Sequence, residues 1–498
     1  MDKLFDRSSE ASILEYARKL LGRSIRELHP EVSSLYTGKG RLGQCVEKYH
    51  FNYEPNSEAK PDFDEVGIEL KCTPLKQIDD GSMVSKERLV LNIIDYLKEA
   101  DNTFETSSFW HKNQHLLLMF YLHEKGVNVI DLVFKIIRLW KFPETDLKII
   151  KDDWEKIHYK LTHGLAHEIS EGDTLYLGAC TKGSKSGAEK RKQKNSNELA
   201  DQRAYSLKSK YLNSIILESL LHPEMCSGLY ISKSQKKKIE KAINEVSSLV
   251  KSVDEYQESE TFEELVERKF KPYYGKTIKE IETKLRVVFT FSPKAISNAV
   301  VHAILGVKTP KIAEFEKANL QQKTIRLESN GNLKESMVFS QIKYNEIVNE
   351  ERWEDSEWYQ ILTQRFLFIV FRKDSSDIDK LAKLEKVFFW TMPPKDLETA
   401  KLFWLDTKDK IKKGDFEHFI SISDDKICHV RPKAKDSSDK MDTPYGPQLK
   451  RGYWLNRQYI LNIVNRHLKS VPYSTSSQPV NYEKAADSWV QGELFKKK

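Results

Sequence analysis

Long apolar runs are missing from this 498-residue sequence: even the stretch Leu116–Leu122 is too short to cross a lipid bilayer. The N-terminus is charged and lacks the pattern of a signal peptide. Cysteine is scarce as well, with five residues and no CxxC pair. These absences argue against a membrane protein, a zinc site and a disulfide framework, and we expect a cytoplasmic protein with no membrane partner.

Net charge is also small: it amounts to +7, from 81 basic and 74 acidic residues. Such a balance permits nucleic-acid binding without arguing for it. Basic residues gather in two stretches, Lys182–Lys194 and Lys233–Lys238. Both patterns also suit a solvated surface, and we prefer that interpretation for the second stretch. At this length we expect two or three domains.

The most informative stretch is a predicted strand together with the turn before it. The strand covers Val66–Cys72, and because side chains alternate between its two faces, Glu69 and Lys71 share one face. Two charges on an otherwise apolar strand are costly if they are merely buried. Pro61 restrains the chain just before Asp62, so this acid can be held toward Glu69 from the turn.

Two carboxylates and an amine at one point are typical of phosphodiester hydrolysis. The carboxylates of Asp62 and Glu69 would hold Mg²⁺, which prefers oxygen ligands and also takes phosphate oxygens. The ion activates a water molecule and neutralises charge at phosphorus. Lys71 would position that water or stabilise the same charge. An acid-x-Lys pair alone is common on solvated strands, so the pattern needs support from elsewhere in the chain.

Two further charged residues lie near this strand in the sequence. Glu47 falls in Gly40–Tyr49, which is predicted to open a helix, and Lys112 precedes the predicted strand Leu116–Tyr121. Each has an ordinary alternative, a surface glutamate and a solvated lysine. The other expected elements are helices at Ser9–Leu21 and Asp152–Gly164, strands at Leu89–Ile94 and Leu175–Cys180, and a turn followed by a helix over Arg203–Leu221.

The second half of the sequence repeats the first at an offset of about 250 residues. Six blocks recur in the same order, and they begin at Gly22 and Gly275, Asp62 and Glu314, Lys86 and Lys334, Phe104 and Trp353, Cys180 and Arg431, and Arg203 and Arg451. No single block is convincing, but six in order indicate a duplicated domain. We expect the first domain at residues 1–227, a linker at 228–258 and the second domain at 259–498.

The two copies differ where the chemistry would occur. Glu69 is replaced by Gln321, which is neutral and a poor metal ligand, and Lys112 has an apolar counterpart. The second copy keeps Lys323 and an acid, Glu314, without the full set. We therefore expect the second copy to bind DNA without cutting it.

The segment from Asp62 to Lys71 resembles the MutH family, the GATC-specific strand-nicking nucleases of mismatch repair. The two-copy layout resembles that family's restriction-enzyme branch, the Sau-type GATC cutters. The resemblance covers nearly the whole chain. It implies an α/β fold of two tandem restriction-endonuclease-like domains, each with a mixed β-sheet flanked by helices.

Carried onto this sequence, the resemblance also implies site residues. The catalytic set would be Asp62, Glu69 and Lys71, with Glu47 as a further acid, Lys112 as a further lysine, and Asp62 and Glu69 as the metal ligands. Asp64 is an alternative ligand that the family's spacing disfavours. The implied DNA-binding residues are Thr181, Lys182, Ser206 and Lys208 in the first copy and Arg431, Lys433, Trp454 and Asn456 in the second.

Two of these residues carry a specific expectation. Lys182 would lie in the loop that reads bases in the major groove, because lysine and arginine suit guanine O6 and N7. Ser206 lies near the position where the nicking enzymes have a tyrosine associated with sensing adenine methylation. The absence of that tyrosine fits a restriction enzyme.

Together with these features, the resemblance implies a type II restriction endonuclease that cuts both strands of DNA at 5′-GATC-3′ with Mg²⁺. The second copy would bind a further GATC site as an effector, so that one molecule, a monomer in solution, holds two sites. A cognate GATC methyltransferase is expected in the host. Two alternatives remain open. One is a mismatch-repair GATC nickase, against which the second copy argues; the other is a non-catalytic GATC-binding protein.

Overall fold

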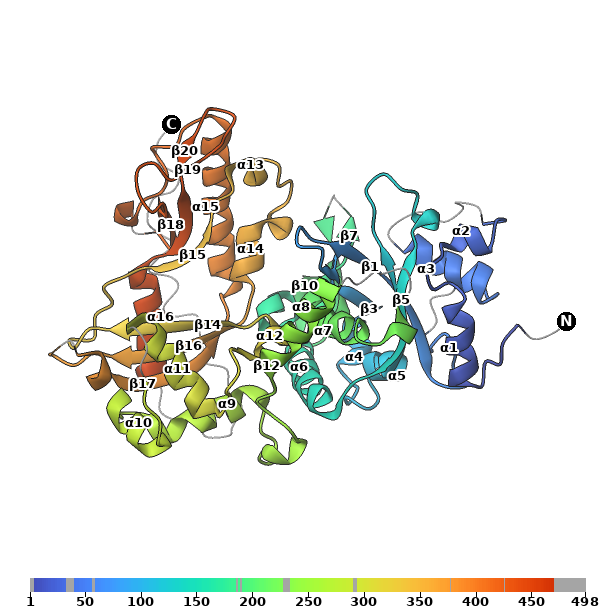
Figure 1. Cartoon of the computed structure of the whole chain (residues 1–498), viewed down its shortest axis with the longest axis horizontal. Helices are drawn as coiled ribbons and strands as arrows, with labels where there is room; N and C mark the ends of the chain where they lie inside the picture. Colours follow the sequence, from blue (N-terminus) through green and yellow to red (C-terminus); the bar gives the residue numbers. More distant parts are fainter. Residues whose placement is uncertain are drawn as a thin grey trace.

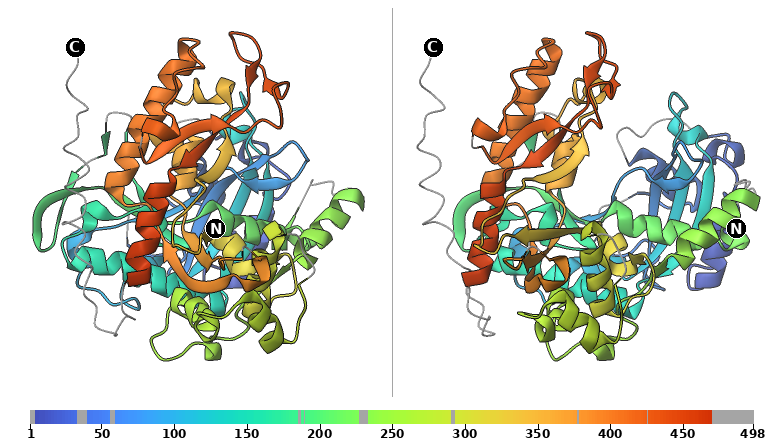
Figure 2. Two further views of the ribbon diagram at one scale, coloured as in Figure 1. Left: turned by 90° about the vertical axis from the view of Figure 1, so that its left-hand side faces the viewer. Right: turned by 60° about the vertical axis from the view of Figure 1, so that its left-hand side comes forward.

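The structure, a computed structural model, describes residues 4–32, 40–55, 59–184, 187–188, 190–226, 233–289, 293–376, 378–424 and 426–469. Part of the basic stretch Lys182–Lys194, including Lys185, lies outside these ranges. The N-terminal and C-terminal halves of the chain each form an α/β lobe (Figure 1). Figure 2 shows the same two lobes from two other sides. Among the described helices, none is long and apolar enough to span a membrane.

The first lobe is built on a mixed sheet with the strand order β2-β1-β4-β5. Its strands are β1 Ile68–Gln77, β2 Met83–Ser85, β4 His115–Leu122 and β5 Phe134–Lys141. β1 and β4 are parallel, with Ile68 opposite His115, and the other pairs are antiparallel. All residues of β4 except Leu122 are buried, as expected for a strand covered on both faces.

A second sheet of the first lobe is antiparallel. It consists of β3 Leu89–Ile93, β11 Arg203–Leu207 and β6 Leu177–Thr181, in that order. The turn predicted at Arg203 is wrong, because this segment pairs with β6 along its length, and the helix α7 Ser209–Ser219 follows it. The helix predicted from Asp152 begins earlier, as α6 Glu144–Thr162.

The second lobe repeats this layout. The strands β14 Gln321–Leu327, β16 Phe366–Arg372 and β17 Lys383–Trp390 correspond to β1, β4 and β5, and β15 Met337–Gln341, β21 Arg451–Leu455 and β18 Cys428–Pro432 correspond to β3, β11 and β6. The register repeats as well, with Thr181 opposite Arg203 and Pro432 opposite Arg451. The predicted tandem pair of mixed-sheet α/β domains is confirmed.

Helices and short strands complete the two lobes. The other helices are α1 Glu10–Arg18, α2 Ile25–Leu28, α3 Arg41–Cys45, α4 Tyr96–Glu99, α5 Ser108–Asn113, α8 Lys233–Asn244, α9 Phe262–Phe270, α10 Ile278–Leu285, α11 Pro293–Leu305, α12 Ala313–Ala318, α13 Tyr344–Ile347, α14 Glu357–Leu362, α15 Pro394–Lys412 and α16 Arg457–Lys469. The other strands are β7 Gly183–Ser184, β8 Gly187–Ala188, β9 Lys190–Gln193, β10 Ser196–Asp201, β12 Val246–Ser247, β13 Lys311–Ile312, β19 Lys440–Met441 and β20 Gln448–Leu449.

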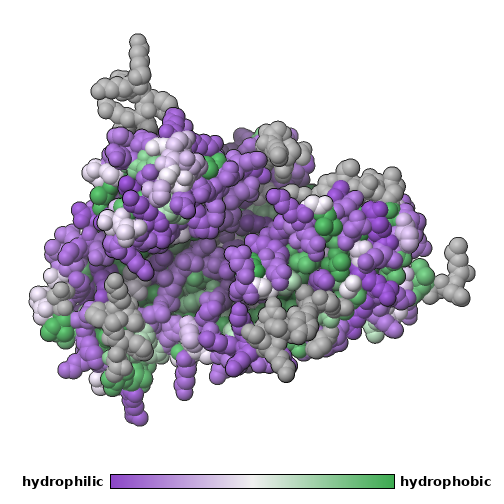
Figure 3. Space-filling view, turned by 45° about the horizontal axis from the view of Figure 1, so that its top comes forward, coloured by the Kyte–Doolittle hydropathy of each residue, from purple (hydrophilic) through white to green (hydrophobic). Residues whose placement is uncertain are grey.

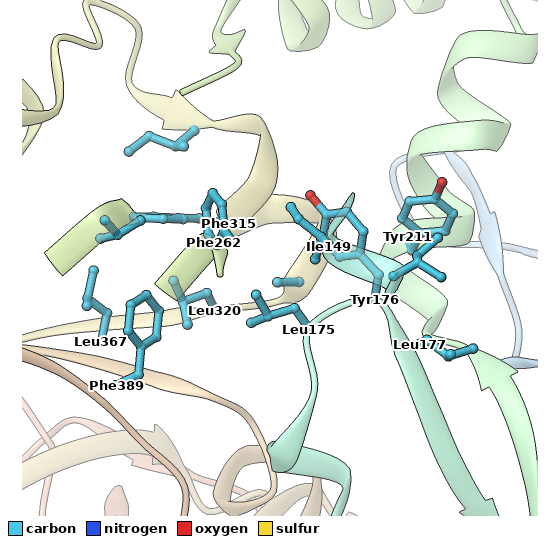
Figure 4. Close-up of a cluster of buried hydrophobic side chains, with 14 of the residues drawn as sticks. Ile149, Leu175, Tyr176, Leu177, Tyr211, Phe262, Phe315, Leu320, Leu367 and Phe389 are labelled. Atoms are coloured by element: carbon cyan, nitrogen blue, oxygen red, sulfur yellow. The ribbon is translucent and has the colours of Figure 1, made fainter. Parts of the chain in front are cut away.

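One hydrophobic core joins the lobes. Buried side chains of the first lobe, such as Tyr176 and Tyr211, continue into Phe262, Phe315 and Phe389 on the other side (Figure 4). A core shared in this way stabilises the lobes together, because separating them would expose its apolar surface to water.

Charged groups reinforce this joint. Lys317 on α12 donates to both carboxylate oxygens of Asp146 on α6, at 2.7 and 2.8 Å. Glu263 on α9 lies 3.2 Å from Lys156 on α6 across the joint, and within the second lobe it binds Arg365 with two hydrogen bonds of 2.8 Å. Burial opposes the charge of Glu263, but Arg365 and Lys156 outweigh it and lower the pKa of this carboxyl to about 2.

The expected linker is also anchored where it meets the second lobe. Leu249 and Val250 are buried, and their backbone N–H groups donate to the carboxylate of Glu314 at 2.9 and 3.1 Å. Glu314 is the residue that aligns with Asp62 in the repeat. In the second lobe this acid therefore holds the linker.

Candidate active site

Glu69 and Lys71 lie on the same face of β1, as the alternation of a strand requires. Only 3% of the Glu69 side chain is exposed. Lys71 Nζ donates to Glu69 Oε1 at 2.6 Å and to the carbonyl oxygen of Leu91 on β3 at 3.2 Å. Lys112, near the end of α5, has its Nζ 3.6 Å from the same Glu69 oxygen. One buried carboxylate thus faces two lysines.

Asp62 is held beside Glu69 by the turn before β1. Its backbone N–H donates to Glu69 Oε2 at 3.2 Å, and its Oδ2 accepts from the backbone N–H of Leu70 at 2.9 Å. Asp64, the alternative ligand, is exposed and lies 3.9 Å from the ammonium group of Lys60. The geometry therefore places Asp62, and not Asp64, in the cluster.

Glu47 completes the group from a different element. It lies in a π-helical turn, Val46–His50, which continues α3; such turns are frequent at functional sites. Burial raises the pKa of Glu47 to about 7, and the nearby charge of Asp62 adds to the shift, whereas Lys71 opposes it. Burial likewise raises the pKa of Glu69 to about 7 against the effect of Lys71. The structure thus brings together all five predicted side chains.

Two residues of this site escape sequence reasoning. The hydroxyl of Tyr53 is buried without a hydrogen-bond partner, and burial together with the charges of Asp62, Glu47 and Glu69 raises its pKa. Arg7 stacks over the Tyr53 ring at 5.4 Å and donates to the backbone oxygen of Asp62 at 2.7 Å. Neither residue stands at a recognisable spacing from the strand, so only the folded chain reveals them.

The donor set suits Mg²⁺. This ion commonly binds through one or two carboxylates and fills its remaining positions with water and phosphate oxygens. Asp62 and Glu69 supply two carboxylates, and the backbone N–H of Asp62 donates to the Glu69 carboxylate. Within the described ranges, no group of three or more His, Cys, Asp or Glu side chains forms a complete ligand cage. The residues therefore fit an ion shared between the protein and a phosphate.

The predicted DNA-binding residues of the first lobe divide into two groups. Thr181 is exposed and Lys182 half-buried, and both follow the buried part of β6. Ser206 is fully buried, with its hydroxyl 3.5 Å from the carbonyl oxygen of Gly178. Lys208 donates to the carbonyl oxygens of Glu171 and Thr174. We therefore correct the expectation for Ser206 and Lys208, because both side chains are engaged inside the protein.

The second lobe shows a similar division. Lys433 is exposed, and Arg431 lies over the ring of the half-buried Trp454 at 4.8 Å. Asn456 is buried, and its side-chain oxygen accepts from the backbone N–H of Gln458 at the start of α16. A direct DNA contact by Asn456 does not fit this placement. The surface between the lobes is hollowed, with mostly hydrophilic residues around the hollow (Figure 3).

Comparison with known proteins agrees with this duplicated site-bearing fold. The family model described as "DNA mismatch repair enzyme MutH" matches residues 51–153 and again residues 306–402. The first match includes β1 with Asp62, Glu69, Lys71 and Lys112 but begins after Glu47, and the second includes β14. The family signal is thus present in both lobes.

Individual relatives show the same relationship at different lengths. The type II restriction enzyme Sau3AI of Staphylococcus aureus is 34% identical over 475 residues, which cover 89% of this chain and 91% of that enzyme. The DNA mismatch repair protein MutH of Vibrio campbellii is 27% identical over 176 residues, covering 34% of this chain and 76% of the relative. MutH of Shewanella woodyi is 26% identical over 186 residues, or 37% and 78%.

Proposed function

We propose that the chain is a type II restriction endonuclease, because it belongs to the MutH family and its sequence aligns along nearly its whole length with a type II restriction enzyme. Its proposed reaction is Mg²⁺-dependent cleavage of both strands of DNA at 5′-GATC-3′. The observation that carries the proposal is the convergence of Glu47, Asp62, Glu69, Lys71 and Lys112 on one buried point of the first lobe.

Each side chain of the cluster has a role in this proposal. Asp62 and Glu69 bind the metal ion, and Glu47 adds a third negative charge beside them. Lys71 is oriented by Glu69 and by the carbonyl of Leu91, so its ammonium group is fixed when a phosphate arrives. A fixed donor stabilises developing charge without a reorganisation cost during the reaction.

Hydrolysis exchanges one P–O bond of the DNA backbone for a P–O bond to a water oxygen, and the departing sugar oxygen takes up a proton. When bound, Mg²⁺ lowers the pKa of a water molecule and neutralises charge on the phosphate. Lys71 and Lys112 add positive charge at the same point. The buried position of Glu69 strengthens these interactions because little water screens them.

The second lobe is proposed to bind a further GATC site and to act as an effector. Gln321 stands where the first lobe has Glu69, so this lobe lacks the carboxylate that would hold the ion. Thr181 and Lys182 in the first lobe and Arg431, Lys433 and Trp454 in the second are the proposed DNA contacts. An effector role requires coupling between two sites. Equal cutting of one-site and two-site plasmids, without stimulation by added GATC duplex, would exclude that coupling.

We further propose that the protein is a cytoplasmic monomer and that a cognate methyltransferase protects the host's GATC sites.

The test of the proposed nuclease activity is cleavage of unmethylated and adenine-methylated plasmid by the wild type and a Glu69→Ala variant, each with Mg²⁺ and with EDTA. Linear fragments that end at GATC, formed with Mg²⁺ by the wild type alone, are expected. Nicked circles alone would support the nickase, and DNA binding without any cleavage would support the binding protein.

A further inference from the structure

The counterpart of the active site in the second lobe has lost its acids. Gln321 replaces Glu69, and the carboxylate of Glu314 is engaged by the linker. α11, which lies before α12 and β14, contains no acidic residue, and Glu316, the other acid of α12, is exposed and pairs with Lys311 at 3.8 Å. Among the described residues, therefore, no carboxylate takes the place of the acids in the first lobe.

The second lobe does keep the lysine of the active-site strand. Lys323 on β14 aligns with Lys71, and its Nζ lies 4.6 Å from the ring centre of Phe339. Phe339 is the third residue of β15, as Leu91 is the third residue of β3. The backbone oxygen that Lys71 occupies in the first lobe is occupied here by a different lysine, because Lys433 donates to the carbonyl of Phe339. Two lysines thus meet at one strand position.

A glycine opens the path of the second lysine. A methyl group at Gly452 would lie 3.0 Å from Cδ of Lys433 and 3.0 Å from the backbone oxygen of Ser340. Both distances are shorter than an ordinary van der Waals contact. The first lobe has Ala204 at the corresponding place, opposite Ile93 as Gly452 is opposite Gln341. The second lobe therefore has a backbone position without a side chain just where Lys433 crosses the sheet.

The two ammonium groups are not neutralised. In the described part of the chain, neither Lys323 nor Lys433 has a carboxylate within 4.0 Å. Burial lowers the pKa of Lys323, and the charge of Lys433 lowers it further. A like charge beside the partly buried Lys323 is unfavourable unless an anion compensates it. The first lobe, in contrast, places a carboxylate between its two lysines.

We propose that Lys323 and Lys433 form a metal-independent phosphodiester site, in which a DNA backbone phosphate binds both ammonium groups. The site deepens the proposed function and rests on it for the identity of the ligand. Arg431 lies on β18, which ends just before Lys433, and Trp454 lies on the neighbouring strand β21; they offer a cation and a half-buried ring to the same duplex. Lysine charge here replaces the metal ion that the first lobe requires.

The test measures binding of a labelled GATC duplex to the full chain in EDTA, where no metal ion contributes. Lys323→Gln and Lys433→Gln are each expected to weaken binding roughly tenfold, as for the loss of a charged hydrogen bond. Each should also reduce the slope of log affinity against log salt by about one. Lys323→Arg should bind as the wild type does, because it keeps the charge. Gly452→Ala should reproduce the Lys433→Gln result without a change of charge.

Matched controls separate this site from general charge effects. Lys435→Gln removes an exposed lysine two residues from Lys433 and should leave binding unchanged. Wild-type affinity in both Lys323→Gln and Lys433→Gln would overturn the proposal. So would displacement of the duplex by micromolar inorganic phosphate, which would identify a site for free phosphate.

The outcome also remains separable from the proposed function. Cleavage by the wild type with Mg²⁺ is measured on the same preparation. Suppose that DNA binding in EDTA depends on the lysine pair and that no condition gives cleavage. This result would support the phosphodiester site and contradict the proposed nuclease activity. Cleavage with unaltered EDTA binding in the lysine variants would do the opposite.

Discussion

The two lobes share six corresponding strands in the same register. They differ in the charged side chains beside the first of these strands, β1 in one lobe and β14 in the other. In the first lobe, acids and lysines alternate around Glu69; in the second, Lys323 and Lys433 stand without a carboxylate. The scaffold therefore does not require the charged cluster. Because the second copy folds without it, the cost of burying Glu69 in the first copy points to a function.

The largest effect is expected from a substitution at Glu69, where the first lobe has an acid and the second lobe has a neutral residue. Glu69→Gln gives the first lobe the residue that the second has at Gln321, and we expect cleavage to fall roughly a thousandfold or more. The midpoint temperature of thermal unfolding should be unchanged or slightly raised, because a buried carboxylate is removed. Plasmid cleavage with Mg²⁺ and thermal unfolding by circular dichroism are the two measurements. Asp64→Asn is the control and should cleave normally; activity lost there instead of at Glu69 would reverse the ligand assignment.

Removing the carboxylate of Glu263 at the joint should have the next largest effect. Glu263→Gln leaves the partly buried Arg365, and Lys156 on α6, without their carboxylate, and we expect the free energy of unfolding to fall by about 3–5 kcal/mol. The pKa of Glu263 is lowered to about 2, so its contribution is present above about pH 4.5 and is lost as the pH falls through 2. Urea unfolding at several pH values should show this dependence in the wild type and lose it in the variant.

A control for this result uses a pair on the surface. Glu346 and Lys343 are 3.1 Å apart and largely exposed, and Glu346→Gln should change the free energy of unfolding by less than about 0.5 kcal/mol. If Glu263→Gln left the free energy of unfolding equally unchanged, the contacts of Glu263 with Arg365 and Lys156 would not contribute to the stability of the fold.

Glu314 and Asp62 should give opposite results at aligned positions. Glu314→Gln weakens the acceptor of two linker N–H groups and should cost about 1–3 kcal/mol of unfolding free energy while cleavage stays within a few-fold of the wild type. Asp62→Asn should abolish cleavage with little effect on stability. Both variants are measured by urea unfolding and by plasmid cleavage. The same outcome in both would show that the two acids have one role.

The smallest effect is expected when an acid is added to the second lobe, because we expect no gain of cleavage activity. Gln321→Glu, made in the Glu69→Gln background, restores one acid in the second lobe but should produce no Mg²⁺-dependent cleavage. Glu314 stays committed to the linker, and α11 offers no further acid. The new charge lies near Lys323, so binding of a GATC duplex in EDTA should change by a few-fold. Recovered cleavage would mean that the second lobe lacks only this residue.

Strand periodicity predicted the central pair of the site correctly. Glu69 and Lys71 lie on one face of β1, and the repeat, read from six weak blocks, corresponds strand by strand to the second lobe. The same reasoning failed at Arg203, where alternation within a five-residue strand was taken for a turn. It also assigned DNA contacts to Ser206 and Asn456, which burial removes from the surface.

The face that Glu69 and Lys71 share could be predicted because it depends on a spacing of two residues along one strand, and the duplication could be predicted because six blocks recur in the same order along the chain. Three contacts appear only in the folded chain: Glu47 and Lys112 reach this strand, Glu314 accepts from the linker, and Lys433 lies near Lys323. Such contacts depend on how separate elements pack. The distance between two elements is set by all the side chains between them, which no local pattern specifies.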